Sequence, residues 1–142
     1  MRVTLFSPKG THRANCNILV KAAPDFSRMK QEELNRMIQA APLSASNWAE
    51  MLGKWPDMRV IESKNVKVDN QPAYFALVEF SHETFDRNVF IKGGHWVTFT
   101  PGTYWQFGCA GKGATIEEAR RSYDYWLPVF KKVMGSFVFE RW

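Results

Sequence analysis

The spacing of apolar residues changes from region to region along the chain and predicts where strands and helices form. Near the start, two short stretches rich in apolar residues flank a polar segment that contains Pro8 and Gly10. Stretches bounded in this way by turn residues are typical of strands. We therefore expect one strand over residues 2–6 and another over residues 14–21.

Apolar residues at a spacing of three to four then predict two helices. The first should have Ser27 as its N-cap and end at Pro42, which cannot continue a helix. The second should have Ser46 as its N-cap, with Trp48 and Trp55 two turns apart on its apolar side. Each helix is therefore expected to bury one side.

From residue 59 to residue 110 the apolar spacing approaches two, which is typical of strands in a sheet. The β-branched and aromatic residues of this region support the same prediction. A polar connection over residues 81–87 interrupts the pattern, as does the pair Gly93-Gly94, which we interpret as a bulge or break. The expected strands are residues 59–68, 73–80, 88–92, 95–100 and 103–110.

The dipeptide Pro101-Gly102 suits the central positions of a type II turn and sets the register of a hairpin. With Thr100 opposite Thr103, His95 and Cys109 point to opposite faces, because successive side chains of a strand alternate. Both faces carry bulky apolar groups in this register. That distribution is expected when helices cover a sheet on each side.

The final helix has the clearest terminal signals. Thr115 and Glu118 have the spacing of a capping box, and an apolar stripe follows at helical spacing as far as Phe137. Pro128 removes one helical hydrogen bond, so we expect a kink or a restart there. Residues 136–142 are predicted to form a short strand or an extended tail.

The composition indicates a single globular domain over residues 1–142. The chain is 45% hydrophobic and 15% aromatic, which suffices for one core and argues against disorder. Its net charge of +5 comes from scattered Lys and Arg residues. Specific nucleic-acid binding needs a clustered basic footprint, so we do not expect it.

The termini and the cysteines bear on the cellular compartment. No apolar run reaches the roughly twenty residues that a membrane-spanning helix needs, and the first residues lack the features of a signal peptide. We expect a periplasmic or secreted protein if a signal segment has been removed, and otherwise a cytoplasmic one. Cys16 and Cys109 match no metal-binding spacing and are either two buried thiols or one disulfide between neighbouring strands.

The segment GCAGKGAT, residues 108–115, is the most suggestive chemical motif. It is not a P-loop, because Gln106 stands where the first glycine belongs and Gly113 follows Lys112. Carboxylates in the first turn of the next helix would also repel a phosphate. We interpret the segment as a connection from strand to helix in which Gly111 and Gly113 let the chain turn.

The order of these elements resembles that of the Mog1/PsbP-like superfamily and its bacterial DcrB-like branch. The resemblance rests on NCNILV leading to a helix near SRMKQEEL and on a C-terminal helix running into GSFVF, and it extends over about residues 15–139. It implies an α+β fold, an α/β/α sandwich with a mainly antiparallel sheet between helices. It also implies a binding or assembly factor rather than an enzyme. The first fifteen residues depart from the usual aromatic-rich opening.

A few polar residues are candidates for catalysis or binding. A nucleophilic Cys109 would need a base such as His82 or His95, but alternation places His95 on the other face. Residues 81–87 are predicted to be a solvated connection, and such loops often carry binding contacts. The expected binding surface consists of His82, Arg87, His95 and Tyr104.

Three classes of function stay open at this point. The leading hypothesis is a non-enzymatic domain that binds an unidentified protein or small ligand, with neither a metal nor another cofactor. The first alternative is a small hydrolase-like enzyme that uses Cys109 or the His82 loop. The second alternative is a polyanion-binding module, which the positive net charge would favour.

Overall fold

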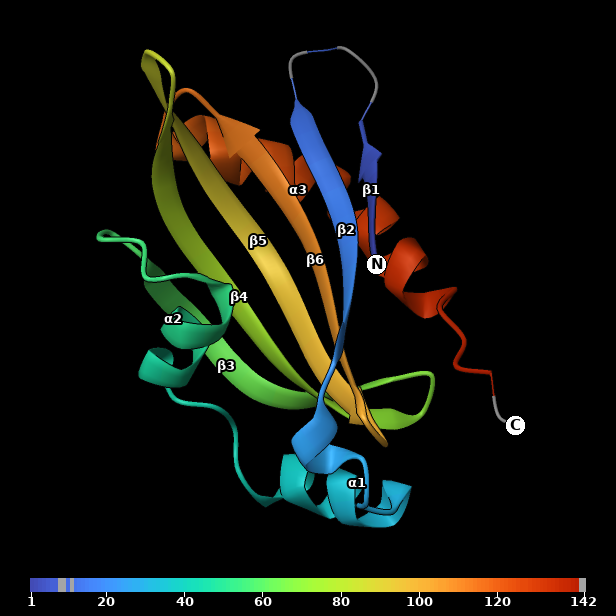
Figure 1. Cartoon of the computed structure of the whole chain (residues 1–142). Coiled ribbons are helices and arrows are strands. Elements are labelled where there is room, and N and C mark those ends of the chain that lie inside the picture. Colours follow the sequence, from blue (N-terminus) through green and yellow to red (C-terminus); the bar gives the residue numbers. More distant parts are fainter. Residues whose placement is uncertain (8–9, 11, 141–142) are drawn as a thin grey trace.

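One antiparallel sheet with helices on both faces forms the structure (Figure 1). This computed structural model describes residues 1–7, 10 and 12–140. Its fold is α+β, with the antiparallel sheet between helices as predicted. The strands, in the spatial order β1-β2-β6-β5-β4-β3, are β1 (Arg2–Phe6), β2 (Arg13–Ala22), β3 (Arg59–Val68), β4 (Gln71–Thr84), β5 (Arg87–Thr100) and β6 (Thr103–Gly113). The helices are η1 (Pro24–Phe26), α1 (Gln31–Ala40), α2 (Ala45–Leu52) and α3 (Ile116–Gly135).

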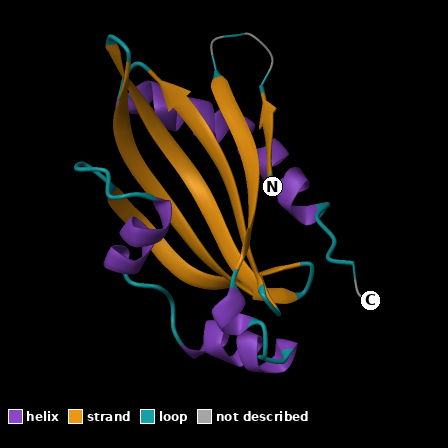
Figure 2. Cartoon of the chain, viewed as in Figure 1, coloured by secondary structure: helices purple, strands orange, loops and turns teal. Residues whose placement is uncertain are grey.

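The two faces of the sheet are covered differently. α3 packs mainly on β6 and β5, and Cys109 and Tyr123 lie in the core between them. On the opposite face, Ile38 of α1 and Trp48 of α2 pack with Val97 of β5. Figure 2 shows these two helices near the rim of the sheet, so within the drawn chain the middle of this face is formed by strands.

The first helix starts later than predicted. Pro24 begins the 3-10 helix η1, and the backbone N–H of Ser27 closes this turn on the Pro24 carbonyl at 3.1 Å. α1 begins after Lys30, whose backbone N–H donates to the Glu33 side chain at 2.8 Å. Ser27 is therefore not the N-cap, because its backbone belongs to the preceding turn.

The second helix is capped by a different serine and is shorter than predicted. Ser44 Oγ accepts the backbone N–H of Asn47 at 3.2 Å, so Ser46 lies inside the first turn and does not cap. Gly53 ends the helix at φ +109°, a conformation that favours glycine. Trp55 therefore lies beyond the helix, where it stacks on Phe80 with 5.3 Å between ring centroids.

β4 and β5 form a longer hairpin than predicted. Their pairing runs without a register shift from Tyr74 opposite Val97 to Thr84 opposite Arg87. The predicted polar connection at residues 81–87 is therefore mostly strand, since residues 81–84 and Arg87 belong to the paired strands. The turn itself consists of Phe85-Asp86.

The predicted break at Gly93-Gly94 is wrong, because both glycines lie inside β5. A Cβ on Gly93 would lie 2.9 Å from the Cβ of Ala110, and one on Gly94 would lie 3.0 Å from the Trp96 ring. Close packing around the strand, and not a turn, accounts for this pair. A register shift is found instead in β3, between Val60 and Glu62.

The hairpin of β5 and β6 has the predicted register. Thr100 pairs with Thr103, and Gly102 has the positive φ, +73°, that the third position of a type II turn requires. β6 then continues through Gly113, so most of GCAGKGAT is strand. The predicted turn at Gly111 and Gly113 is wrong, because these glycines let α3 pack directly on the strand.

α3 begins at the predicted cap. Thr115 Oγ1 accepts the backbone N–H of Glu118 at 3.2 Å. The helix does not restart at Pro128, because burial of Tyr123 and Phe130 on either side holds it against the sheet. Neither α3 nor any other helix in the described chain is both long and apolar enough to cross a membrane.

The C-terminal segment packs on the sheet without joining it as a strand. The Phe137 ring lies 4.5 Å from the Phe107 ring, and the Phe139 ring lies 5.4 Å from the Trp105 ring, between centroids. The last two positions of the predicted tail, 141 and 142, lie outside the described residues. Aromatic packing therefore fixes the chain end as far as Phe139.

Candidate functional site

The four residues predicted to form a binding surface share one face of the sheet. Strand alternation places His82, Arg87, His95 and Tyr104 on the face opposite α3, together with Val97. They do not form one site, however. His82 and Arg87 line a cavity at one end of the sheet, whereas Tyr104 lies close to the other end of β6.

The cavity beside His82 and Arg87 has a volume of about 810 Å³. It lies where the β4–β5 hairpin, the start of β2 and the end of β6 meet. Its basic lining residues are Arg13, His82, Arg87 and Lys112, and we call it the cationic cavity.

Strand pairing brings two of these basic residues together, since Arg13 of β2 lies directly opposite Lys112 of β6. In the described part of the chain, no carboxylate oxygen lies within 4.0 Å of the charged groups of Arg13, Arg87 or Lys112. Burial lowers the pKa of Lys112, because a half-buried ammonium group loses hydration. The cavity therefore holds positive charge that the described chain does not neutralise.

One carboxylate, that of Glu118, also lines the cationic cavity. Its Oε2 atom accepts the backbone N–H of Ala114 at 2.8 Å, just before α3 begins. Arg13, Arg87 and Lys112 thus share the described lining with one carboxylate that already has a structural partner. Guanidinium groups are well suited to hold carboxylate or phosphate oxygens, because their N–H groups form a planar fork.

His95 lies in the middle of the same face, close to Gly93 and Gly108. A Cβ on Gly108 would lie 3.0 Å from His95 Nδ1 and 3.1 Å from Asn17 Oδ1, so a larger residue would displace the ring. Both ring nitrogens are buried and have no hydrogen-bond partner among the residues described. Burial lowers the pKa of His95 to about 4, and the imidazole is therefore neutral at pH 7.

Tyr104 is held in the core on this face and does not reach the cationic cavity. Its hydroxyl donates to Gln106 Oε1 at 2.8 Å, and its ring lies 5.6 Å from the Phe99 ring. Burial raises the pKa of Tyr104 to about 12. Its surroundings are those of a packing residue with a satisfied hydroxyl.

Cys16 and Cys109, which lie directly opposite each other in β2 and β6, are joined by a disulfide. Cys109 is 1% exposed and faces α3, whereas His95 is on the other face. In this disulfide-bonded form Cys109 has no thiolate to act as a nucleophile. Over the described ranges, no three His, Cys, Asp or Glu side chains are placed to hold a metal ion.

Arg13 and Lys112 were missed by the sequence prediction, although they complete the cationic cavity. They come from strands that are far apart in the chain, and local periodicity says nothing about which distant strands pair. The positions of the two cysteines could have predicted that Arg13 and Lys112 lie together. If Cys16 is set opposite Cys109 in an antiparallel pair, counting three residues along each strand sets Arg13 opposite Lys112.

Comparison with known proteins supports the fold. No protein-family model and no curated protein matches the sequence. Among solved structures, the chain is similar to the crystal structure of PA94 from Pseudomonas aeruginosa, a protein of unknown function described as a candidate regulator. The match has a TM-score of 0.60 at 10% identity and covers 100% of this chain and 85% of PA94. Similarity at this level of identity shows a common fold and carries no function with it.

Proposed function

We propose that the protein is a non-enzymatic binding domain that holds an anionic ligand in the cationic cavity. The observation that carries this proposal is the gathering of Arg13, Arg87 and Lys112 around one cavity, with no carboxylate within salt-bridge distance in the described chain. Grouped cations repel one another, and a bound anion relieves that repulsion.

The arrangement favours a compact anionic group over an extended polyanion. The cations surround a single cavity and do not form a stripe along a helix or strand, which is the usual footprint of nucleic-acid binding. Arg13 and Arg87 come from different strands, and each guanidinium group can hold a phosphate or carboxylate group through paired N–H groups. Lys112 adds a positive charge to the same lining, and an ammonium group places few directional demands on the ligand.

Binding is favoured over hydrolysis by the surroundings of the candidate catalytic residues. Cys109 is in a disulfide, and His82 lies beside the Trp55 ring with its Nδ1 atom 3.5 Å from the Glu83 carbonyl oxygen. Among the residues that the structure describes, neither belongs to a nucleophile–base pair. We also propose a periplasmic or secreted location, because structural disulfides persist mainly in oxidising compartments.

A titration with small anions tests the proposed function. Inorganic pyrophosphate and citrate serve as probes in isothermal titration calorimetry at low and at physiological salt. We expect Arg13→Ala and Arg87→Ala each to weaken binding about tenfold or more, because each removes charge-assisted hydrogen bonds. Added salt should also weaken binding to the unmodified protein.

Arg36→Ala is the matched control, since Arg36 is an exposed arginine of α1 far from the cationic cavity. Its affinity for the probes should equal that of the unmodified protein. If neither probe binds, or if all three variants bind alike, the cationic cavity is not an anion site.

A further inference from the structure

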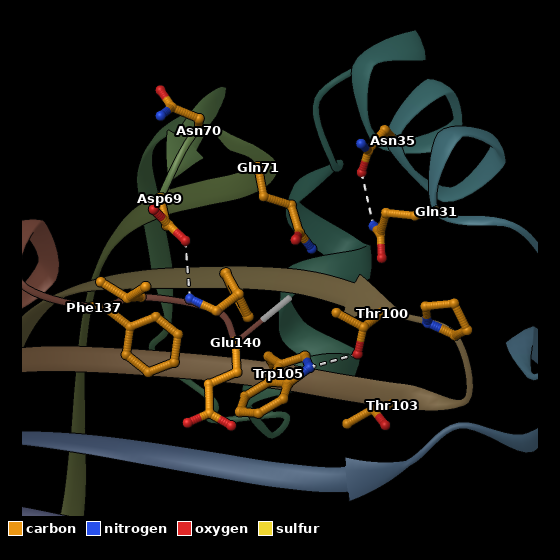
Figure 3. Close-up of a pocket in the computed structure, with 13 residues that line it drawn as sticks. Gln31, Asn35, Asp69, Asn70, Gln71, Thr100, Thr103, Trp105, Phe137 and Glu140 are labelled. Carbon is orange, nitrogen blue, oxygen red and sulfur yellow. Dashed lines mark hydrogen bonds between the residues drawn. The ribbon is translucent and has the colours of Figure 1, made fainter. Parts of the chain in front are cut away.

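A second cavity lies at the opposite end of β6, where the β5–β6 turn meets α1, the β3–β4 turn and the C-terminal segment (Figure 3). Its volume is about 1070 Å³, just above the range of about 300–1,000 Å³ that is typical of small-ligand sites. Side chains with amide or hydroxyl groups provide much of its lining, and we call it the amide cavity. These side chains are Gln31, Asn35, Asn70, Gln71, Thr100 and Thr103.

Hydrogen bonds to the backbone hold two of the amides in place. Gln31 Nε2 donates to the Phe99 carbonyl oxygen at 3.0 Å and to Asn35 Oδ1 at 2.9 Å. Gln71 Nε2 donates to the same Phe99 carbonyl at 3.0 Å and to Thr98 Oγ1 at 3.1 Å. Because both bind one carbonyl, the two amide groups lie side by side.

Several amide atoms of the amide cavity are held in position but have no hydrogen-bond partner in the described chain. The nitrogens of Gln31 and Gln71 are used, whereas their Oε1 atoms accept no hydrogen bond from the described chain. Asn35 Oδ1 is used, which leaves its amide nitrogen as a donor. A ligand that both donates and accepts hydrogen bonds can therefore be held without moving these side chains.

The charges of the amide cavity are opposite in sign to those of the cationic cavity. Asp69 and Glu140 line it, and its described lining contains no Lys or Arg. Asp69 Oδ2 accepts the backbone N–H of Phe139 at 2.9 Å, which fixes this carboxylate against the C-terminal segment. Within the described lining, no cation offsets the two carboxylates, and these would repel an anionic ligand.

Trp105 supplies an aromatic wall whose orientation is fixed. Its indole N–H donates to Thr100 Oγ1 at 2.9 Å, and Figure 3 shows the ring between Thr100 and Glu140. Phe137 and Phe139 meet the same ring edge to face, with centroid distances of 6.1 and 5.4 Å. Since Thr100 Oγ1 accepts from the indole, its own hydroxyl hydrogen is free for a ligand.

We infer that the amide cavity binds a neutral carbohydrate. Each sugar hydroxyl is both a donor and an acceptor, which matches the mixed amide, hydroxyl and carboxylate lining. The apolar face of a sugar ring also packs well on an indole. A simple cationic amine would satisfy Asp69 and Glu140 but would leave the donors of Asn35, Thr100 and Thr103 unused. The site is independent of the proposed anion site.

Binding of soluble pentasaccharides tests this inference. Pentasaccharides of glucose, mannose and N-acetylglucosamine are screened by saturation-transfer NMR, with spermidine as a cationic probe. The tightest binder is then measured by calorimetry. We expect at least one neutral pentasaccharide to bind with little dependence on salt, because no ion pair forms. Asn35→Ala and Thr103→Ala should each weaken binding about fivefold or more.

Two further variants sharpen the test. Glu140→Gln keeps a hydrogen-bonding oxygen and should change affinity for a neutral sugar by less than about threefold. Arg87→Ala, in the cationic cavity, should leave sugar binding unchanged. Alanine is a better helix former than asparagine, so Asn35→Ala is expected to fold, and circular dichroism checks this for every variant.

Three results would overturn the inference: that no pentasaccharide binds, that Asn35→Ala and Thr103→Ala bind as well as the unmodified protein, or that only spermidine binds and Glu140→Gln abolishes it. None of these results affects the anion site, whose probes and arginine variants are separate. Loss of pyrophosphate binding in Arg87→Ala with retained sugar binding would show two independent sites.

Discussion

His95 is buried, and its ring has no hydrogen-bond partner in the described chain. We expect this residue to make the stability of the fold depend on pH. Gly93 and Gly108 leave room for its ring, and both ring nitrogens are buried and unpaired in the described chain. Protonation would place a buried positive charge on the imidazole without a hydrogen-bond partner in the described chain to stabilise it, which costs free energy. The neutral form is therefore strongly preferred, which explains why the pKa of His95 falls to about 4.

We predict that His95 makes the protein lose stability between about pH 6.5 and pH 4. In this interval the unfolded chain binds a proton at His95, whose ordinary pKa is 6.5, while the folded protein does not. The free energy of unfolding therefore decreases as the pH falls, by at most about 3 kcal/mol. Urea unfolding of the unmodified protein and of His95→Gln at pH 7, 5.5 and 4.5 measures the effect, and the variant should lose most of the slope.

Another buried ionisable group acts in a different pH interval. Glu79 accepts hydrogen bonds from Arg120 and Arg59, and these hydrogen bonds lower the pKa of its carboxyl below the usual 4.5. The stabilisation that Glu79 contributes to the folded protein is complete above pH 4.5 and is lost only as the pH falls further.

The control for the His95 prediction is His82→Gln, a histidine change on the same face of the sheet. An identical slope in the unmodified protein and in His95→Gln would contradict the assignment.

At the scale of elements, the contact of α3 with β6 depends on two glycines in the strand. A Cβ on Gly111 would lie 2.2 Å from the backbone nitrogen of Tyr123, and a Cβ on Gly113 would lie 2.4 Å from the Cβ of Glu118. The helix could not approach so closely over any larger residue. Backbone atoms cannot move aside as the end of a flexible side chain can.

Gly111→Ala should therefore destabilise the protein by about 3 kcal/mol or more, because α3 must shift away from the strand. Gly135→Ala is the matched control, since no atom lies within 4 Å of its added Cβ. That second change should be neutral or stabilising by up to about 1 kcal/mol. Urea unfolding gives both values. Equal stabilities for the two variants would show that the approach of α3 to Gly111 is not a close contact.

The same glycines show where prediction from the sequence stops. Pro101-Gly102 fixed a register because turn chemistry is local, and Thr115 identified a helix start for the same reason. The sequence predicts a bulge or break at Gly93-Gly94 and a turn at the glycines of GCAGKGAT. Their actual cause is a partner from elsewhere in the chain, and spacing along one strand does not reveal it.

At the scale of the whole molecule, the fold class could be predicted and the candidate sites only in part. Alternation along the predicted hairpin puts His95 and Tyr104 on one face, whereas His82 and Arg87 are predicted to lie in a polar connection. Strand pairing puts all four on one face, but their separation along the strands gives them different surroundings. The cationic cavity also needs the pairing of β2 with β6, and the amide cavity needs four segments that meet only in the folded chain. Long-range strand pairing is the missing information in both cases.

The disulfide links β2 to β6 covalently. Its removal tests how far the stability of the fold and the shape of the cationic cavity depend on this link. Cys16 and Cys109 are 93 residues apart in sequence. Closing so long a loop restricts the unfolded chain and stabilises the folded state by about 4 to 5 kcal/mol in the chain-entropy model. We predict a loss of this size for Cys16→Ala/Cys109→Ala in urea unfolding.

The affinity of the folded double variant for pyrophosphate should change much less, by under about threefold. Arg13 and Lys112 are held opposite each other by a pairing that runs along the whole of β2, from Arg13 to Ala22, and this ladder does not need the disulfide once the chain is folded. Thiol titration of the unfolded, unreduced protein should find neither cysteine free. Two reactive thiols, or a double variant as stable as the unmodified protein, would contradict the predicted role of the disulfide in stability. A large loss of pyrophosphate affinity in the folded double variant would contradict the claim that strand pairing alone holds the cavity in shape.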